Sequence, residues 1–464
     1  EIMPSLVGSE MCIRDRVAAA EGKVTVDFYL INEKNVRGNH QLKISVTDYQ
    51  GKVMEVGTYE TEAAGGEVYG QLLVKDVKIP VPTAGGLCRI EAKLCKENSV
   101  VTTGYDDILS VNLASNMLDG KGAVWEDGSA LQNFLKGKTK EAVAAYEDNL
   151  GKLDWIMVAR PPRKDQLTMV PMEALRSADG KPGLDVVYYE DMEFQKEVYH
   201  EVAKVVNLSA IEGATPSPFV YMLDGYGIKW SGKLLPSVSG EYTIIPQSND
   251  RSMIEVFVNG KKIYEITRKK EHLGDGKVYL EGGKSADIEI RFRHPRSNAR
   301  CRLDWAVPND KMPDAQRLME RAVNDGTKIF IIQSADEWSE FIAANSKVVF
   351  KDKFFVGTNW LGGVMFNKPH DIFKELPVGN ALNWPYQALI HTGVERMGLV
   401  MEGEELLVGA YHTYPMAIGT AMGIVPMGKG SVLFSTLDIY GNIINDSAAG
   451  LVAKKLIFNM IDFK

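Results

Sequence analysis

The chain carries few side chains whose type and spacing indicate nucleophilic or metal chemistry. Among its 464 residues are four cysteines, Cys12, Cys88, Cys95 and Cys301. No CxxC pair occurs, so neither a zinc site nor a disulfide framework is indicated. Cys88 and Cys95 are seven positions apart in a strand-like run, which places them on opposite faces of a straight strand. We therefore expect no disulfide between them.

The histidines also match no compact catalytic or metal motif. His370, His391 and His412 are widely and nearly evenly spaced in the C-terminal part of the chain. We expect each to be a buried, hydrogen-bonded histidine. The small and aromatic residues of Gly409–Gly423 either line a crevice at strand ends or pack closely, and we favour close packing. No GxSxG elbow is present, and Phe434–Thr436 is typical of a plain strand.

Charge and hydropathy exclude other functional classes. Acidic clusters occur at Glu190–Glu193 and Glu402–Glu405, and we expect them on the surface or in turns, because charged side chains are mostly exposed. The net charge is −8 and no long basic block occurs, so nucleic acid is not an expected partner. No apolar run approaches the roughly 20 residues that cross a bilayer, so no membrane span is expected.

The chain divides into segments in which apolar residues recur at different spacings. These segments predict the strands and helices that would position any site. Alternating apolar residues, a turn at Asp48–Gly51 and further strand patterns predict an immunoglobulin-like β-sandwich over residues 17–114. Strand and helix patterns then alternate over 115–193 and again over 309–464, which predicts one discontinuous α/β domain with a parallel sheet. Residues 194–308 return to strands and tight turns, and Asn259-Gly260 is a strong hairpin signal. They predict an inserted β-sandwich.

Several segments of the α/β domain have sequence patterns that predict individual strands and helices. We expect a strand, turn and short helix over Gly120–Leu135, and buried strands at Leu153–Ala159, Leu184–Glu190 and Thr327–Ile332. Helices are expected after Pro313-Asp314, after the capping-box sequence of Ser334–Glu337, and after Asn445–Ser447; a strand is expected within Gly428–Ile439.

The apolar residues of the N-terminal segment recur at no regular spacing, and the segment lacks a signal-peptide pattern. Leu6–Arg16, LVGSEMCIRDR, closely resembles the conceptual translation of a transposase adapter used to prepare sequencing libraries. We therefore interpret residues 1–16 as a non-native segment and Val17 as the first natural residue. On this interpretation the chain is the tail of a longer protein.

Two family resemblances follow from these segments. Ile228–Asp250, Val256–Ile263, Val278–Phe292 and Leu303–Pro308 resemble the protective-antigen-type β-sandwich of adhesins, toxins and carbohydrate-active enzymes. The other resemblance is to the C-terminal region of family 2 glycoside hydrolases of the β-galactosidase type, including an amidotransferase-like, flavodoxin-like domain. It is carried by Tyr29–Val53, Gly357–Phe366, Leu382–Gly398 and Gly428–Ile443.

The resemblances imply accessory modules and no catalytic residues. The family's paired glutamates lie on a barrel that would precede this chain, so no catalytic residue is assigned. The α/β segments contain no cysteine, which excludes glutaminase chemistry. Some relatives of the inserted sandwich bind calcium and sugar through adjacent aspartates, for which the nearest match is Asn249-Asp250. Tyr226 is the expected sugar-stacking aromatic, and Trp230 is expected in the core.

The sequence therefore predicts the non-catalytic accessory modules of a β-galactosidase-type glycoside hydrolase. Its expected partners are the glycan substrate and the upstream catalytic barrel. We expect this chain to be inactive alone and to have no resident cofactor. A calcium ion at Asn249-Asp250 is the alternative to a plain turn there. By resemblance the parent enzyme is periplasmic or secreted. The alternative is a freestanding carbohydrate-binding or assembly protein that acts through the inserted sandwich; a divergent hydrolase in the α/β domain has least support.

Overall fold

The structure is a computed structural model, and its chain is mostly β-strand. It describes residues 2–6, 16–66, 68–97, 99–113, 117–162, 167–209, 225–248, 251–296, 299–308, 313–356, 363–391, 397–413, 416–444 and 448–463. Contacts divide the chain into two units. The first unit comprises residues 1–119, 365–389 and 441–464, and the second comprises residues 120–364 and 390–440.

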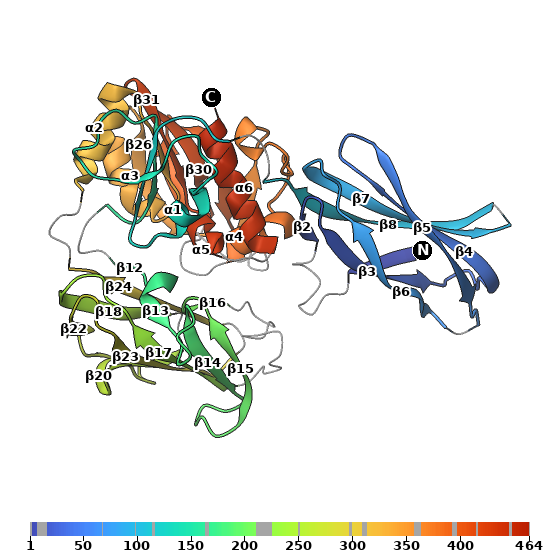
Figure 1. The fold of residues 1–464 in the computed structure, drawn as a ribbon, viewed down its shortest axis with the longest axis horizontal. Helices are drawn as coiled ribbons and strands as arrows, with labels where there is room; N and C mark the ends of the chain where they lie inside the picture. Colours follow the sequence, from blue (N-terminus) through green and yellow to red (C-terminus); the bar gives the residue numbers. More distant parts are fainter. Residues whose placement is uncertain are drawn as a thin grey trace. The chain divides into compact units, whose positions relative to one another are not determined.

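The first unit contains a β-sandwich, as its alternating sequence predicted (Figure 1). One sheet pairs β1 (Ile2–Leu6), β3 (Lys23–Ile31) and β6 (Gly70–Pro80). The other pairs β2 (Val17–Ala19), β8 (Ser99–Val111), β7 (Gly86–Lys96), β4 (Gly38–Thr47) and β5 (Val53–Ala63). Apolar residues of both sheets form one core, because every second residue of each strand points inward.

The C-terminal helix α6 (Ala448–Asp462) packs with the first unit. Lys455 is only 3% exposed, and its ammonium lies 2.6 Å from Glu375 Oε2 and 3.2 Å from the carbonyl oxygen of Asn112. The Asn459 amide donates to the carbonyl groups of Ile372 and Lys374, both at 2.9 Å. The helix itself is where the sequence predicted it, but these contacts group it differently from the expected 309–464 α/β segment.

A mixed sheet forms the first part of the second unit. Its parallel strands are β10 (Ala144–Ala145), β9 (Gly122–Glu126), β11 (Trp155–Ala159), β25 (Lys328–Ile331) and β31 (Gly430–Ser435), in that spatial order. The sheet continues with the antiparallel strands β30 (Ala417–Met427), β28 (Met397–Glu402) and β26 (Val349–Phe355), while β29 (Glu405–His412) pairs with β30 and β27 (Gly363–Asn367) pairs with β29. Ranked by sequence, the parallel strands have the order 2-1-3-4-5.

Three helices of this unit lie where the sequence predicted them. They are α1 (Ala130–Leu135), α2 (Ala315–Asp325) and α3 (Ala335–Ala344), counted over the described residues alone. Asp314 caps α2 by accepting from the backbone N–H groups of Gln316 and Arg317. Buried residues of α2 and α3, including Leu318 and Trp338, pack against the parallel strands in one core.

The rest of the second unit is a β-sandwich. Its larger sheet joins β15 (Glu197–Ala203), β14 (Leu184–Tyr189), β17 (Tyr226–Leu234), β23 (Ala286–His294), β19 (Met253–Val258), β20 (Lys261–Ile266) and β21 (His272–Leu273), with β13 (Leu175–Arg176) beside β17. Its smaller sheet joins β12 (Thr168–Met169), β24 (Arg300–Ala306), β18 (Gly240–Ser248) and β22 (Lys277–Leu280), with β16 (Asn207–Ser209) beside β24. The Asn259-Gly260 hairpin forms with φ of 49° and 75°, as its sequence predicts.

The sandwich includes strands that the sequence analysis placed in the α/β domain. Leu184–Tyr189 was expected in the parallel sheet, but β14 pairs antiparallel with β17 and β15. The strands β12 and β13 also pair with sandwich strands. The strand was predicted correctly and its sheet was not, because an apolar run carries no information about which strand pairs with it.

Candidate functional site

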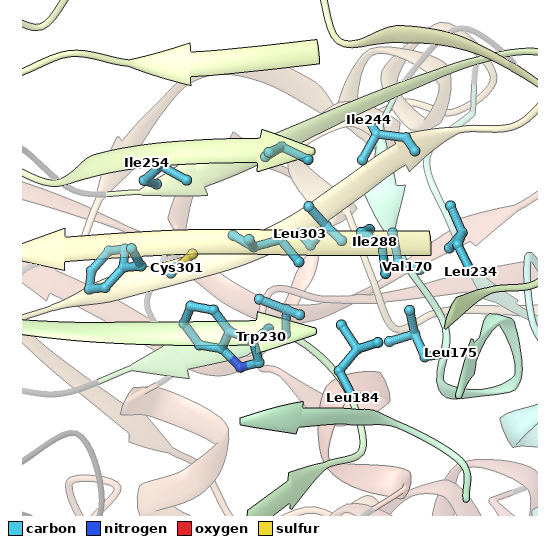
Figure 2. Packing of buried hydrophobic residues seen from close by; sticks show 14 of the residues in the cluster. Val170, Leu175, Leu184, Trp230, Leu234, Ile244, Ile254, Ile288, Cys301 and Leu303 are labelled. Atoms are coloured by element: carbon cyan, nitrogen blue, oxygen red, sulfur yellow. The ribbon is translucent and has the colours of Figure 1, made fainter. Parts of the chain in front are cut away.

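Tyr226 and Trp230 lie in the core of the inserted sandwich. Trp230 is 3% exposed, as predicted, and Figure 2 shows it among aliphatic residues that include Leu303. Tyr226 is 0% exposed, with its ring centroid 6.4 Å from that of Phe292 and 6.2 Å from that of His294. The expectation that Tyr226 stacks on a sugar is corrected: its ring is covered by core neighbours.

Asn249 and Asp250 lie outside the described residues. The chain directly after them has a defined backbone conformation and one buried side-chain contact. Arg251 has φ of 79°, and the buried Ser252 hydroxyl lies 3.0 Å from His294 Nδ1. His294 ends β23, whose neighbour β19 begins just after Ser252. The Asn249-Asp250 pair therefore immediately precedes a fixed point at one end of the sandwich.

The charged groups at this end pair with one another. Arg293 lies opposite Met253 in the strand register and donates to Glu255 Oε2 at 2.9 Å and to the carbonyl oxygen of Met192 at 3.0 Å. Its guanidinium also lies 4.6 Å from the ring centroid of Phe194. Partial burial would raise the pKa of Glu255, but hydrogen bonds from Arg293 and Lys262 outweigh it and lower that pKa. These groups stabilise the sandwich and are not poised for acid–base chemistry.

The predicted acidic cluster at Glu190–Glu193 contains a turn carboxylate. Asp191 accepts hydrogen bonds from the backbone N–H groups of Glu193, Gln195 and Lys196, at 2.6 to 3.2 Å. Desolvation would raise the pKa of Asp191, but these backbone donors lower it on balance. This agrees with the expectation that the cluster lies on the surface or in a turn.

At the carboxyl ends of β9 and β11 the parallel sheet has its topological switch point, where doubly wound sheets place ligands. In this structure a hydrogen-bond network among the protein's own side chains occupies the switch point. Arg160, 6% exposed, donates from Nη1 to Asp127 Oδ1 at 2.5 Å, and Thr168 Oγ1 donates to Asp127 Oδ2 at 2.6 Å. Thr168 belongs to β12 of the sandwich. The network connects the parallel sheet to the sandwich and occupies the groups that would otherwise meet a ligand.

A second carboxylate at this edge also accepts hydrogen bonds from within the protein. Glu126 accepts from the backbone N–H groups of Leu131 and Gln132 at the start of α1, both at 3.1 Å. The Tyr440 hydroxyl donates to Glu126 Oε2 at 2.9 Å. Burial raises the pKa values of Glu126 and Tyr440. Glu126 therefore caps the N-terminus of α1, because Ser129 makes no side-chain capping hydrogen bond there.

The turn after the fourth parallel strand, β25, has a conformation that was not predicted from the sequence. Ser334, between β25 and α3, has φ of 54° and ψ of 34°, a left-handed conformation that is strained for serine. The strand, the strained residue and the helix together have the geometry of a nucleophile elbow. The GxSxG pattern has glycines on both sides of the serine, and Ser334 has none at those positions. Among the described residues, no hydrogen bond joins the Ser334 hydroxyl to a base, so the elbow has no activated nucleophile there.

We expect Ser334→Gly to raise the free energy of unfolding by about 1 kcal/mol, because a left-handed conformation costs serine energy and costs glycine almost none. The side chain makes no capping hydrogen bond to α3 that the substitution would lose. Urea unfolding of the whole chain measures the change. Glu340→Gly, an exposed position inside α3, is the matched control and should lower stability by about 1 kcal/mol. A Ser334→Gly variant that loses stability as the control does would contradict strain at the elbow.

The other candidate residues have structural roles. Cys88 and Cys301 lie in the first and inserted sandwiches, and these cysteines and Cys95 are free and buried. Burial raises the pKa of Cys88 to about 11, which leaves it a thiol at neutral pH. His370 Nδ1 accepts from the backbone N–H of Ile372. His370 and His412 are only half-buried, so the expectation that each histidine is buried is wrong for these two, and the side chain of His391 lies outside the described residues.

No membrane-spanning helix is found over the described residues. The same residues contain no cluster of three or more histidine, cysteine, aspartate or glutamate side chains able to hold a metal ion.

Comparison with known proteins finds a family match for one part of the chain. The PA14 domain family matches residues 180–317, which include the larger part of the inserted sandwich. The anti-sigma-I factor RsgI3 of Acetivibrio thermocellus is 27% identical over 127 residues. That match covers 27% of this chain and 19% of RsgI3.

Solved structures have low overall similarity to the chain. A β-glucosidase from Kluyveromyces marxianus aligns with 12% identity and a TM-score of 0.34, over 49% of this chain and 30% of the glucosidase. A PA14 sugar-binding domain from an RTX adhesin aligns with 14% identity and a TM-score of 0.22, over 26% of this chain and 88% of that domain. The chain thus spans less than a third of the glucosidase and about a fifth of RsgI3. What these comparisons show is a match of residues 180–317 to the PA14 domain family.

Proposed function

We propose that the chain binds a glycan through its inserted sandwich. The PA14 match over residues 180–317 is the observation that carries this proposal, because this family includes a domain described as sugar-binding. The ligand residues we propose are Asn249 and Asp250, with a calcium ion that their oxygens and neighbouring carbonyl groups would hold. The anchored Ser252–His294 contact directly after them supports the choice, because a binding loop needs a fixed base.

We further propose that the chain forms accessory modules of a β-galactosidase-type glycoside hydrolase, acting outside the cytoplasm where such glycans occur. An amidotransferase-like α/β domain fits this assignment, and the 2-1-3-4-5 order of parallel strands supports it. The ion pair at the switch point and the elbow without a base support a non-catalytic role. The catalytic residues would then belong to a preceding barrel.

Glycan-array binding by the whole chain tests the first proposal. We expect binding to β-galactosides or related glycans that is lost in Asp250→Ala and after removal of calcium with EDTA. Asp275→Ala, the same substitution at an exposed position of the same sandwich, is the control and should bind normally. No glycan binding by the unsubstituted chain, or equal binding by Asp250→Ala, would contradict the proposal.

The accessory role is tested separately. We expect no turnover of an aryl β-galactoside by this chain alone, and an uninterrupted sequencing read through the genomic region around Val17 should continue upstream into a barrel with paired glutamates. Turnover by the purified chain would contradict the non-catalytic assignment. A natural gene that starts near Val17 would favour the freestanding binding protein.

A further inference from the structure

The first unit contains a pocket of about 190 Å³ that none of the preceding assignments uses. Its rim is formed by Leu87 and Asp107 of the sandwich and by Asn380, Asn383 and Trp384 of the segment after β27. All of these residues belong to the first unit. Pockets for drug-sized ligands begin at roughly 300 Å³, so this pocket has room for about one ring of a ligand.

The floor of the pocket is rigidly built. Asn367, 4% exposed, donates from Nδ2 to the carbonyl oxygen of Pro377 at 2.8 Å and to the Tyr386 hydroxyl at 3.3 Å. The Tyr386 hydroxyl donates to the same carbonyl at 2.6 Å. The backbone of the segment is also fixed, because Leu382 donates to the carbonyl of Met365 at 2.7 Å. The pocket therefore exists before any ligand arrives, which lowers the entropy cost of binding.

The rim combines an aromatic ring with polar groups that have hydrogen-bonding capacity left for a ligand. Trp384 and Asn383 begin a short 3-10 turn, and Asn383 is exposed and makes no side-chain capping bond there. Asn380 makes only a long contact of 3.5 Å from Nδ2 to the carbonyl of Val378, so its oxygen is available. Asp107 accepts two bonds from Arg89 out of the roughly four that a carboxylate can accept. An indole ring beside amide and carboxylate groups suits a ligand with an apolar face and several hydroxyl groups.

The charges around the pocket are balanced. Arg89 pairs with Asp107 at 2.9 Å, and Arg16 pairs with Asp106 at 2.8 Å. Two carboxylates are thus matched by two guanidinium groups, and the rim has no excess charge that would attract an ion. An uncharged ligand fits this balance.

We propose that this pocket is a second glycan site, which takes a single neutral sugar ring with its apolar face on Trp384. It lies outside the inserted sandwich and goes beyond the binding site proposed there. The Arg16 guanidinium lies 5.9 Å from the Trp384 ring centroid. Since Arg16 ends the segment that resembles an adapter, this cation covers part of the ring in the present chain.

Tryptophan fluorescence of the whole chain tests the site, with galactose, glucose and lactose as probes. The background is Asp250→Ala, which removes the proposed sandwich site and keeps the two proposals separable. In this background we expect saturable binding of at least one sugar, and we expect Trp384→Ala to weaken it about tenfold or more when binding is measured by calorimetry. Asn383→Ala should weaken it by a smaller factor. Tyr69→Ala, an exposed aromatic substitution in the same unit that does not line the pocket, is the control and should bind normally.

Arg16→Ala tests whether the guanidinium competes with the sugar for the Trp384 ring. We expect this variant to bind the sugar at least as tightly, because the guanidinium lies over that ring. Weaker binding by Arg16→Ala would show that the guanidinium contacts the sugar and would overturn stacking of the sugar on the face of the ring that Arg16 covers. Absence of sugar binding in the Asp250→Ala background, or equal binding by Trp384→Ala, would overturn the site. Circular dichroism of each variant must match that of the unsubstituted chain, because Trp384 also packs near the buried Tyr386.

Discussion

Trp338→Ala is expected to lower the free energy of unfolding of the second unit by about 4 kcal/mol, as for other large core residues cut back to alanine. Trp338 is 0% exposed on α3 and packs edge-on against Trp125, with ring centroids 5.7 Å apart. Its indole N–H donates to the carbonyl oxygen of Arg160 at 2.7 Å. The substitution therefore leaves a cavity under the parallel sheet and an unpaired buried carbonyl, and the two costs add.

Urea unfolding followed by circular dichroism measures this effect, with separate transitions allowed for the two units. Trp338→Phe keeps an aromatic ring but loses the hydrogen bond, so it should cost about half as much. Trp384→Ala, in the first unit and partly exposed, is the matched tryptophan control and should leave the transition of the second unit unchanged. A Trp338→Ala chain with an unshifted transition would show that α3 does not stabilise the sheet.

The strands and helices were largely predictable because their signals are local. Alternation in Lys23–Ile31 and the capping carboxylate of Asp314 each act over a few residues, and the structure has the expected elements there. The partners of strands were less predictable. Leu184–Tyr189 has a strand pattern, but its pairing with β17 is decided by side chains more than 35 residues away along the chain.

The sites were harder to predict than the elements. Tyr226 has the residue type that stacks on sugars, but burial depends on contacts with Phe292 and His294 from a distant strand. The pocket of the first unit joins Leu87 to Trp384, which lie about 300 residues apart in the sequence. Ser334 was missed for a different reason: its conformation is left-handed without any flanking glycine that would signal it.

The second large effect is expected at the switch point of the parallel sheet. Asp127→Ala should destabilise the second unit by about 3 to 5 kcal/mol, because it leaves the buried Arg160 cation without its carboxylate. Burial already lowers the pKa of Arg160, and Asp127 is the group that opposes this shift. The same substitution removes the acceptor of the Thr168 hydroxyl, so the attachment of β12 is weakened as well.

A double-mutant cycle with Arg160→Met separates the charge from the packing. The double variant Arg160→Met with Asp127→Ala should be more stable than Asp127→Ala alone, because no uncompensated charge remains buried and methionine fills much of the space. Urea unfolding at low and high salt measures the cycle, and salt should change little, since both side chains are mostly shielded from solvent. The exposed pair of Lys233 and Asp287 is the control: Asp287→Ala should cost no more than about 1 kcal/mol. If Asp127→Ala costs no more than this control, the network does not stabilise the junction.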